Sequence, residues 1–156
     1  MESLYPTQLN LSFNEAARIL VVEDDPDTLE MLAVYFAEQG YFVATARTGT
    51  EALEATWHGP GFDVVLLDLF IPDIGGLEVL AEISRLTDGP SVILVTGLAD
   101  KEIAHDALKL GAFDYILKPY NLEQVESSVV ACLAHRECMK KVGGETHRLK
   151  TCQLNA

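Results

Sequence analysis

The stretch FDVVLLDLFIPD, residues 62–73, decides how the rest of the chain is interpreted. Its four apolar residues, 64–67, form a short unbroken run of the kind that fills a parallel strand covered on both faces. The run ends at an acid, Asp68, and Pro72 and two glycines then indicate a loop. Open parallel sheets bind ligands outside the carboxyl ends of their strands. Asp68 is therefore expected at a place suited to chemistry, although an isolated loop acid is more often a cap or a solvated residue.

Polar side chains also end the other strands that the sequence predicts. Glu23 and Asp24 follow a first apolar run, RILVV. Thr96 closes the run SVILVT, and Lys118 follows the run FDYIL. Each residue alone has an ordinary explanation, as a turn acid, a β-branched strand residue or a surface charge. Together with Asp68 they make a much more specific pattern, because all of them fall at strand ends.

Amphipathic helices separate the predicted strands. Asp25 and Pro26 suit the start of the first helix, and Gly40 suits its end. The expected strands are residues 18–23, 41–46, 64–67, 91–96 and 113–117, and the expected helices begin at residues 26, 49, 77, 99 or 100, and 122. This alternation predicts an α/β fold, a doubly wound five-stranded parallel sheet of the flavodoxin-like type in the order 2-1-3-4-5.

That strand order has a consequence for the polar residues. The first and third strands become neighbours, so Glu23, Asp24 and Asp68 are expected to converge on one crevice. Thr96 and Lys118 reach the same crevice from the fourth and fifth strands. Three crowded acids repel one another unless a cation lies between them. Because Mg²⁺ prefers oxygen ligands and keeps several waters, it suits such a set of carboxylates.

Composition and charge limit the classes of function. The chain has 156 residues, 49% of them hydrophobic, which is enough for one domain with a full core. Its net charge is −13, so we expect no direct binding to nucleic acid and no attraction to anionic lipid. The apolar runs are far too short to span a bilayer, and the N-terminus lacks the pattern of a signal peptide. A cytoplasmic protein without membrane association is expected.

The two ends of the chain carry weaker patterns than its middle. Residues 1–17 show no clean period and are expected to form an N-terminal extension. Residues 137–156 are richer in basic residues, and Gly143 and Gly144 are expected to interrupt any helix, so this part is predicted to be a tail or a linker. The chain's three cysteines all lie in its last quarter, without a CxxC pair, which argues against a disulfide framework and a zinc site. Reduced thiols are expected.

Over residues 18–136, the sequence resembles the receiver domain of bacterial two-component response regulators. The resemblance rests on the acids, the hydroxyl and the lysine at the strand ends. It implies that Asp68 is the phosphoacceptor and that Asp24 ligates Mg²⁺ directly. Glu23 is implied to hold the ion, often through water, and the backbone carbonyl of Phe70 is implied to supply a further ligand.

The resemblance also assigns the residues that would respond to phosphorylation. Thr96 matches the hydroxyl that bonds the phosphoryl group, Lys118 matches the lysine that pairs with it, and Pro119 then follows in what is often a cis peptide. Tyr115 matches the aromatic switch residue. The implied output surface is formed by the helix after Thr96, the strand of residues 113–117 and the last helix.

Two positions depart from the commonest family pattern. Phe70 lies two residues after Asp68, and Leu98 lies two residues after Thr96, where many members have polar or charged residues near the attacking water. We predict slow hydrolysis of the acyl phosphate, because neither side chain can orient water. The alternative is that both side chains pack on loops away from the path of the water.

The resemblance implies partners as well as chemistry. The phosphoryl donor would be a sensor histidine kinase or a phosphotransfer protein, and the output surface would offer a possible homodimer interface. The chain would not be an enzyme in the usual sense, because it would catalyse only its own phosphorylation and dephosphorylation. It would be either a single-domain regulator or the receiver piece of a longer protein.

Three other classes of function remain alternatives. A degenerate receiver that serves only as a docking module is disfavoured by the complete set of acids, hydroxyl and lysine. A haloacid-dehalogenase-like phosphatase would need a second acid where this chain has Phe70. A flavodoxin-like FMN carrier would need a phosphate-binding loop after the first strand, where this chain has acids.

Overall fold

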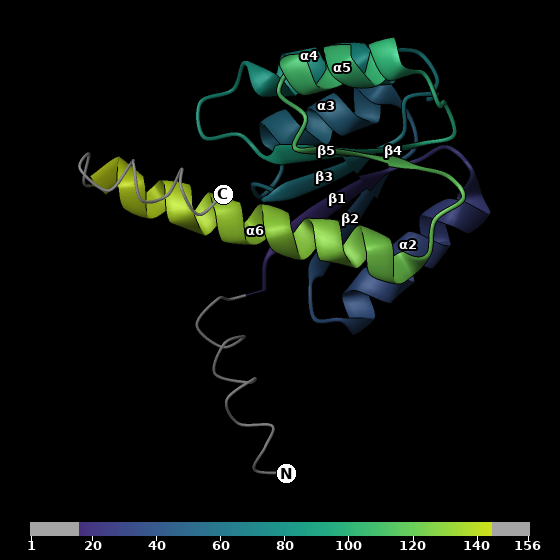
Figure 1. The fold of residues 1–156 in the computed structure, drawn as a ribbon. Helices are drawn as coiled ribbons and strands as arrows, with labels where there is room; N and C mark the ends of the chain where they lie inside the picture. The colour runs from purple at the N-terminus through teal and green to yellow at the C-terminus, as the bar shows by residue number, and fades with distance from the viewer. Residues whose placement is uncertain (1–15, 145–156) are drawn as a thin grey trace.

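The structure is a computed structural model, and it describes residues 16–144. These residues form a parallel sheet in the order β2-β1-β3-β4-β5 with helices on both faces, which confirms the predicted fold class and strand order (Figure 1). The strands are β1 (Arg18–Val22), β2 (Phe42–Ala46), β3 (Val64–Leu67), β4 (Ser91–Thr96) and β5 (Asp114–Leu117). The helices are α2 (Pro26–Glu38), α3 (Gly49–His58), α4 (Gly76–Ser84), α5 (Lys101–Lys109) and α6 (Leu122–Gly144).

The central strand β3 is buried on both faces of the sheet. Val64 and Leu66 pack with α2 and α6, whereas Val65 and Leu67 pack with α3, α4 and α5. Figure 1 shows the same two layers of helices on opposite faces. Burial on both sides explains why this strand is an unbroken apolar run rather than an alternating one. Asp68 lies where the chain leaves this apolar environment.

The start of α2 removes one acid from the crevice. The carboxylate of Asp25 caps the helix, accepting hydrogen bonds from the backbone N–H of Thr28 at 2.9 Å and from its hydroxyl at 2.7 Å. Pro26 occupies the first turn, as the sequence predicted. The hydrogen bonds from Thr28 lower the pKa of Asp25, so this residue stays charged at the helix N-terminus. Asp25 is thus engaged as a cap rather than as a member of the acidic cluster.

The last helix is longer than the sequence indicated. α6 continues past Arg136 to Gly144, so residues 137–144 are helical, and the predicted interruption at Gly143 is wrong. Arg136 ties the helix to the sheet by donating hydrogen bonds at 3.1 Å to the carbonyl oxygen of Gly89 and to the hydroxyl of Ser91. The predicted end of the receiver domain at Arg136 therefore falls inside a helix. Residues 1–15 and 145–156 lie outside the described part of the chain.

Several element ends differ from the predictions by small amounts. β1 ends at Val22, so Glu23 lies just beyond the strand, and β2 and β5 each begin one residue later than expected. Cys132 is a buried free thiol in the core between α6 and the sheet. Cys138 is disulfide-bonded, against the expectation of reduced thiols. Within the described residues, no helix combines the length and the apolar character needed to cross a membrane.

Candidate functional site

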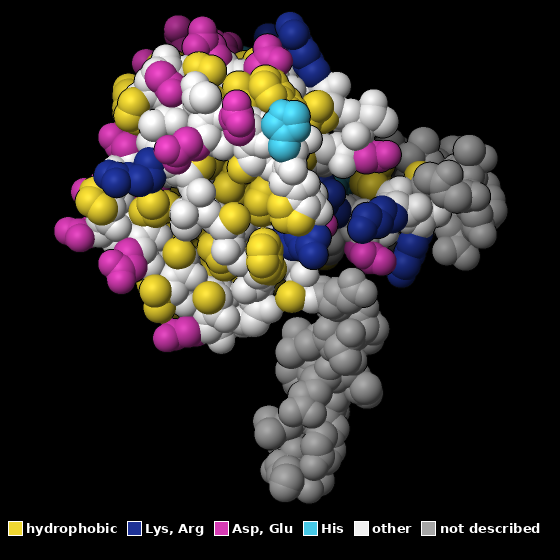
Figure 2. All heavy atoms as spheres, turned by 180° about the vertical axis from the view of Figure 1, so that it is seen from behind, with side chains coloured by type: hydrophobic (Ala, Val, Ile, Leu, Met, Phe, Trp, Pro, Cys, Tyr) yellow, Lys and Arg dark blue, Asp and Glu magenta, His cyan; other side chains and the backbone are white. Residues whose placement is uncertain are grey.

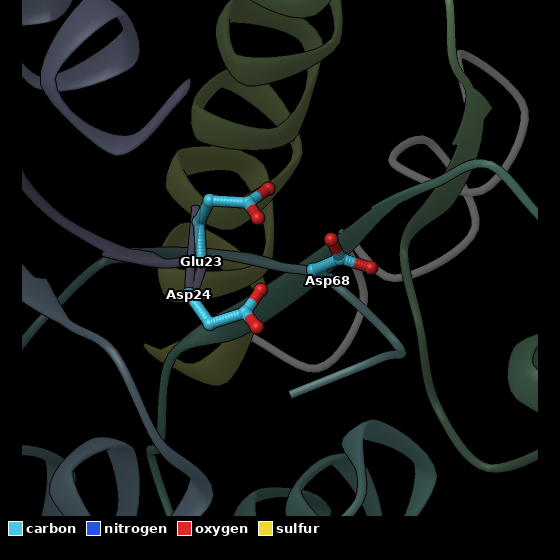
Figure 3. Close-up of side chains that lie close together, drawn as sticks. All are labelled: Glu23, Asp24 and Asp68. Atoms are coloured by element: carbon cyan, nitrogen blue, oxygen red, sulfur yellow. The ribbon is translucent and has the colours of Figure 1, made fainter. Parts of the chain in front are cut away.

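Three acids meet at the carboxyl ends of two neighbouring strands. Glu23 and Asp24 follow β1, Asp68 follows β3, and ligand oxygens of all three lie within 4.8 Å of one another. Figure 3 shows the three side chains close together, with Glu23 and Asp24 on one segment and Asp68 on another. Glu23 and Asp68 are only 3% and 6% exposed, whereas Asp24 is exposed. The structure therefore brings together the acids that the strand order predicted as neighbours.

Lys118 joins two of these acids from the far side of the crevice. Its ammonium group donates hydrogen bonds at 2.9 Å to Oδ2 of Asp68 and at 3.0 Å to Oε1 of Glu23. The peptide bond between Lys118 and Pro119 is cis, and it follows the end of β5. Burial alone would lower the pKa of Lys118, but its hydrogen bonds to Asp68 and Glu23 outweigh that effect and raise it. Lys118 is therefore a permanent cation in the site.

Backbone N–H groups hold the second oxygen of each buried acid. Oε2 of Glu23 accepts a hydrogen bond from the N–H of Asp25, and Oδ1 of Asp68 accepts one from the N–H of Phe70, both at 3.1 Å. Burial raises the pKa of Glu23 more than Lys118 and the N–H of Asp25 lower it, and the charge of Asp68 adds to the rise. The two buried carboxylates are thus fixed in orientation by the protein itself.

The charge of the cluster suits a divalent cation. Three carboxylates and one ammonium group, −3 + 1, leave a formal charge of −2. Carboxylate oxygens are hard ligands, and Mg²⁺ takes one or two of them together with water and substrate oxygens. The exposed carboxylate of Asp24 leaves one side of the cluster open to solvent. The donor set therefore fits Mg²⁺.

Thr96 and Tyr115 are linked through the backbone of Leu98. Thr96 is fully buried at the end of β4, and its hydroxyl accepts a hydrogen bond from the N–H of Leu98 at 3.4 Å. The hydroxyl of Tyr115, on β5, donates to the carbonyl oxygen of Leu98 at 2.7 Å. Burial raises the pKa of Tyr115, which keeps the phenol protonated as a donor. A single loop residue thus connects the two predicted switch residues.

The two apolar departures from the family pattern have different environments. Phe70 is 62% exposed, so its ring lies at the surface rather than in the core, while its backbone N–H donates to Asp68. Leu98 is partly buried and packs against the core layer formed by α3, α4 and α5. Packing on a loop thus describes Leu98 better than Phe70. The predicted slow hydrolysis remains a prediction.

The comparison with protein families decides the class of this site. The family model for the response regulator receiver domain matches residues 19–130. The chain belongs to this family of receiver domains. The resemblance drawn from the strand-end residues is thereby confirmed. The matched residues include the ends of β1 and β3, where the acidic cluster lies.

Relatives of this receiver are regulators of greater length. The regulatory protein AtoC of Escherichia coli is 36% identical over 127 residues, which cover 80% of this chain and 27% of AtoC. The transcriptional regulatory protein KdpE of Mycobacterium tuberculosis is 38% identical over 106 residues, which cover 68% of this chain and 46% of KdpE. The chain thus spans less than half the length of these two relatives.

Solved receiver structures share the fold almost from end to end. A CheY-like receiver domain protein from Methanospirillum hungatei has a TM-score of 0.75 and 32% identity, over 79% of this chain and 98% of that chain. A structure described as the CheX-CheY-BeF3-Mg complex from Borrelia burgdorferi has a TM-score of 0.69 and 28% identity, over 75% of this chain and 89% of that chain.

Sequence reasoning missed the neighbours of Asp24. The guanidinium group of Arg47 donates a hydrogen bond at 3.1 Å to the main-chain carbonyl oxygen of Asp24. Arg47 follows β2, an edge strand that carries none of the predicted site residues. No spacing in the sequence indicates this contact, because it depends on how two loops fold beside each other. The parallel pairing of β1 with β2 is the only signal that could have suggested it.

Proposed function

We propose that this receiver accepts a phosphoryl group on Asp68 and relays that change to a partner. The observation that carries the proposal is the environment of Asp68. Its carboxylate is almost fully buried at a strand end, 2.9 Å from the ammonium group of Lys118 and beside Glu23 and Asp24. A nucleophile of this kind needs the charge of the incoming group to be neutralised, and the site supplies one cation and three carboxylates able to hold another.

The proposed donor is a phosphohistidine of a sensor histidine kinase or of a phosphotransfer protein, met in the cytoplasm. A carboxylate oxygen of Asp68 forms a bond to phosphorus while the phosphorus–nitrogen bond breaks. The leaving imidazole nitrogen keeps the electron pair and takes up a proton. Lys118 pairs with one phosphoryl oxygen, and the hydroxyl of Thr96, which accepts from the N–H of Leu98, donates its own proton to another. The family of the chain supports this donor class.

We further infer that Mg²⁺ is the resident cation. Asp24 and Asp68 would hold it directly, Glu23 would hold it through water, and the main-chain carbonyl of Phe70 would complete the protein ligands. When bound, Mg²⁺ neutralises negative charge on the acids and on the phosphoryl group. The donor set supports this choice, as does the description of the Borrelia burgdorferi complex, which contains BeF3 and Mg.

The proposed output surface is the face of α5, β5 and α6. Tyr115 lies on β5 and is connected to Thr96 through Leu98, so movement of the Thr96 hydroxyl can change the position of its ring. Leu108 on α5 and Leu117 on β5 are large apolar residues that remain exposed. A homodimer or a partner docked on this face would cover them. The chain's net charge of −13 makes direct binding of nucleic acid an unsuitable output.

Phosphorylation from a small donor tests the proposal. The protein is incubated with acetyl phosphate and Mg²⁺, and the phosphorylated fraction is measured by intact-protein mass spectrometry. We expect one phosphoryl group per chain, none on the Asp68→Asn variant, and normal labelling of Asp88→Asn, which changes an exposed acid in the turn after α4. Normal labelling of Asp68→Asn would show that the proposal is wrong.

The same experiment separates the alternatives. A phosphatase would consume many equivalents of acetyl phosphate without retaining label, and a docking module would take up none. An FMN carrier would absorb visible light after incubation with FMN. The proposed receiver would retain label and bind no flavin.

A further inference from the structure

A short turn from the edge of the sheet bridges the two loops that carry the acidic cluster. We call residues 47–50, which comprise the two residues after β2 and the first two residues of α3, the bridging turn. On one side the guanidinium group of Arg47 donates at 3.1 Å to the main-chain carbonyl oxygen of Asp24. The backbone N–H of Arg47 is itself held at 2.7 Å by the side chain of Glu51. The turn is thus hydrogen-bonded to the backbone of the loop after β1.

On its other side the bridging turn is hydrogen-bonded to the loop after β3. The N–H of Gly49 donates at 3.1 Å to the carbonyl oxygen of Pro72, and the N–H of Thr50 donates at 3.1 Å to Oδ1 of Asp73. A Cβ atom at Gly49 would collide with the backbone and side chain of Ile74. The two segments therefore touch backbone to backbone, a contact that only glycine permits.

Asp73 has both the backbone conformation and the side-chain acceptor that this contact with the bridging turn requires. Its φ angle is 63°, in the left-handed region that favours glycine, asparagine and aspartate. In that conformation the same Oδ1 atom also accepts a hydrogen bond from the N–H of Ile74. One carboxylate oxygen thus fixes both its own loop and the start of α3.

We propose that Arg47 and Asp73 are positioning residues for the cation site, because together they set the distance between the loop of Asp24 and the loop of Asp68 and Phe70. The proposal rests on the proposed function of the site as a Mg²⁺ site. Asp24 needs such support: its exposed carboxylate receives no hydrogen bond from the described residues, so its backbone must be held instead. Mg²⁺ demands nearly ideal octahedral geometry, so small shifts between the loops weaken binding.

The test is the dissociation constant for Mg²⁺, measured by isothermal titration calorimetry. We expect Arg47→Ala and Asp73→Gly each to raise it about fivefold, or about 1 kcal/mol, the scale of one hydrogen bond. Asp73→Gly keeps the left-handed backbone and removes only the acceptor. Arg47→Gln keeps a donor without the charge, so we expect it to restore much of the affinity. Thermal unfolding of each variant reports whether the fold is intact.

Two residues elsewhere in the chain provide matched controls. Asp88 is a second exposed aspartate with a positive φ, 60°, in the turn after α4, so Asp88→Gly repeats the change at Asp73 away from the acids. Arg85 is an exposed arginine that, among residues 16–144, pairs with Glu82 alone, at 3.5 Å, so Arg85→Ala repeats the change at Arg47. Both controls are expected to leave the dissociation constant for Mg²⁺ unchanged.

Kinetics separates positioning from a direct part in the chemistry. At saturating Mg²⁺, we expect the phosphorylation rate of Arg47→Ala and Asp73→Gly to stay within about twofold of the wild-type rate, while the half-saturating Mg²⁺ concentration rises about fivefold. Both residues anchor the same bridging turn. The dissociation constant for Mg²⁺ of the double variant should therefore rise by less than the product of the two single-variant fold-changes.

The results discriminate this inference from the proposed function. If the wild type binds Mg²⁺ and the two single variants bind it equally well, this inference alone is overturned, even if both variants unfold at lower temperature. Effects that multiply fully in the double variant would also overturn it, because the residues would then act separately. A wild type that binds no Mg²⁺ would overturn the proposed function together with this inference.

Discussion

The two ends of the sheet use similar charged residues in opposite ways. At the carboxyl ends of the strands, three acids cluster beside Lys118, which pairs with two of them. At the amino ends, Asp63 accepts a hydrogen bond at 2.8 Å from the N–H of Arg18 and lies 3.9 Å from the guanidinium group of Arg136. The first end, which we call the acidic rim, has excess negative charge, whereas at the second, which we call the base, Asp63 is matched by Arg136.

That difference distinguishes a candidate ligand-binding site, the acidic rim, from a structural ion pair at the base. A matched charge at the base is satisfied within the folded chain, so its contribution is to stability. Unmatched charge at the acidic rim costs stability in the absence of a ligand, because like charges repel at short range. It is retained where binding of a cation and a phosphoryl group relieves it. Substitutions at the two ends should therefore affect different measurements.

The largest contrast is expected between the two cations. Lys118→Met removes the group proposed to pair with a phosphoryl oxygen, and we expect it to slow phosphorylation by acetyl phosphate about a hundredfold. Arg136→Met removes hydrogen bonds to Gly89 and Ser91, and we expect it to lower the free energy of unfolding by about 1–2 kcal/mol with phosphorylation nearly unchanged. Urea unfolding and labelling rates measure the two effects. Similar labelling rates in the two variants would contradict the prediction that Lys118, and not Arg136, contributes to phosphorylation.

A second contrast compares one acid from each end. Asp24→Asn removes a charge from the acidic rim, so we expect Mg²⁺ binding to weaken about tenfold while the free energy of unfolding without Mg²⁺ stays level or rises. Asp63→Asn should leave Mg²⁺ binding unchanged and lower the free energy of unfolding by about 1 kcal/mol. Calorimetry and urea unfolding test both. A loss of stability in Asp24→Asn would mean that this acid is also structural.

A third prediction concerns water at the acidic rim. Phe70 is exposed beside Asp68 and offers no polar atom to orient an attacking water. We expect Phe70→Asn to shorten the lifetime of the phosphorylated protein about fivefold, an effect within the usual range for placing one polar group. The decay of the phosphorylated mass after removal of the donor measures it. Phe70→Leu is the matched control, and a wild-type lifetime of only seconds would contradict the prediction of slow hydrolysis.

The smallest expected effect is that of salt. Added NaCl screens repulsion between charges, so in the absence of Mg²⁺ it should raise the unfolding temperature of the wild type more than that of Asp24→Asn. Expressed as the salt-dependent gain in the free energy of unfolding, the difference between the two proteins should be below about 1 kcal/mol, because Asp24 is exposed and already partly screened. Thermal unfolding at several NaCl concentrations measures it. Equal salt responses would indicate that the acids at this end are not under repulsion.

Topology explains why much of the site was predictable. The apolar run of β3 and the polar residues at the ends of β1, β4 and β5 are visible in the sequence, and the strand order brings those ends together. Glu23, Asp24 and Asp68 met as expected, and Lys118 reached two of them. Periodicity locates elements, and right-handed connections limit their order. The positions of strand ends follow from these rules.

Contacts between loops were not predictable in the same way. The hydrogen bonds of Arg47 to Asp24 and of Thr50 to Asp73 join segments from three different strands, and they depend on loop conformations that leave no periodic pattern. The continuation of α6 to Gly144 was also missed. A glycine weakens a helix by only about 1 kcal/mol, which the rest of a long helix can offset.

The backbone of Leu98 has a consequence for how this protein can evolve. Both hydrogen bonds that connect Thr96 with Tyr115 use main-chain atoms of Leu98, its N–H and its carbonyl oxygen. Mutation can therefore replace the leucine side chain without severing the connection between β4 and β5. Substitutions of this partly buried side chain can therefore change how the loop packs while the two main-chain hydrogen bonds between β4 and β5 are kept.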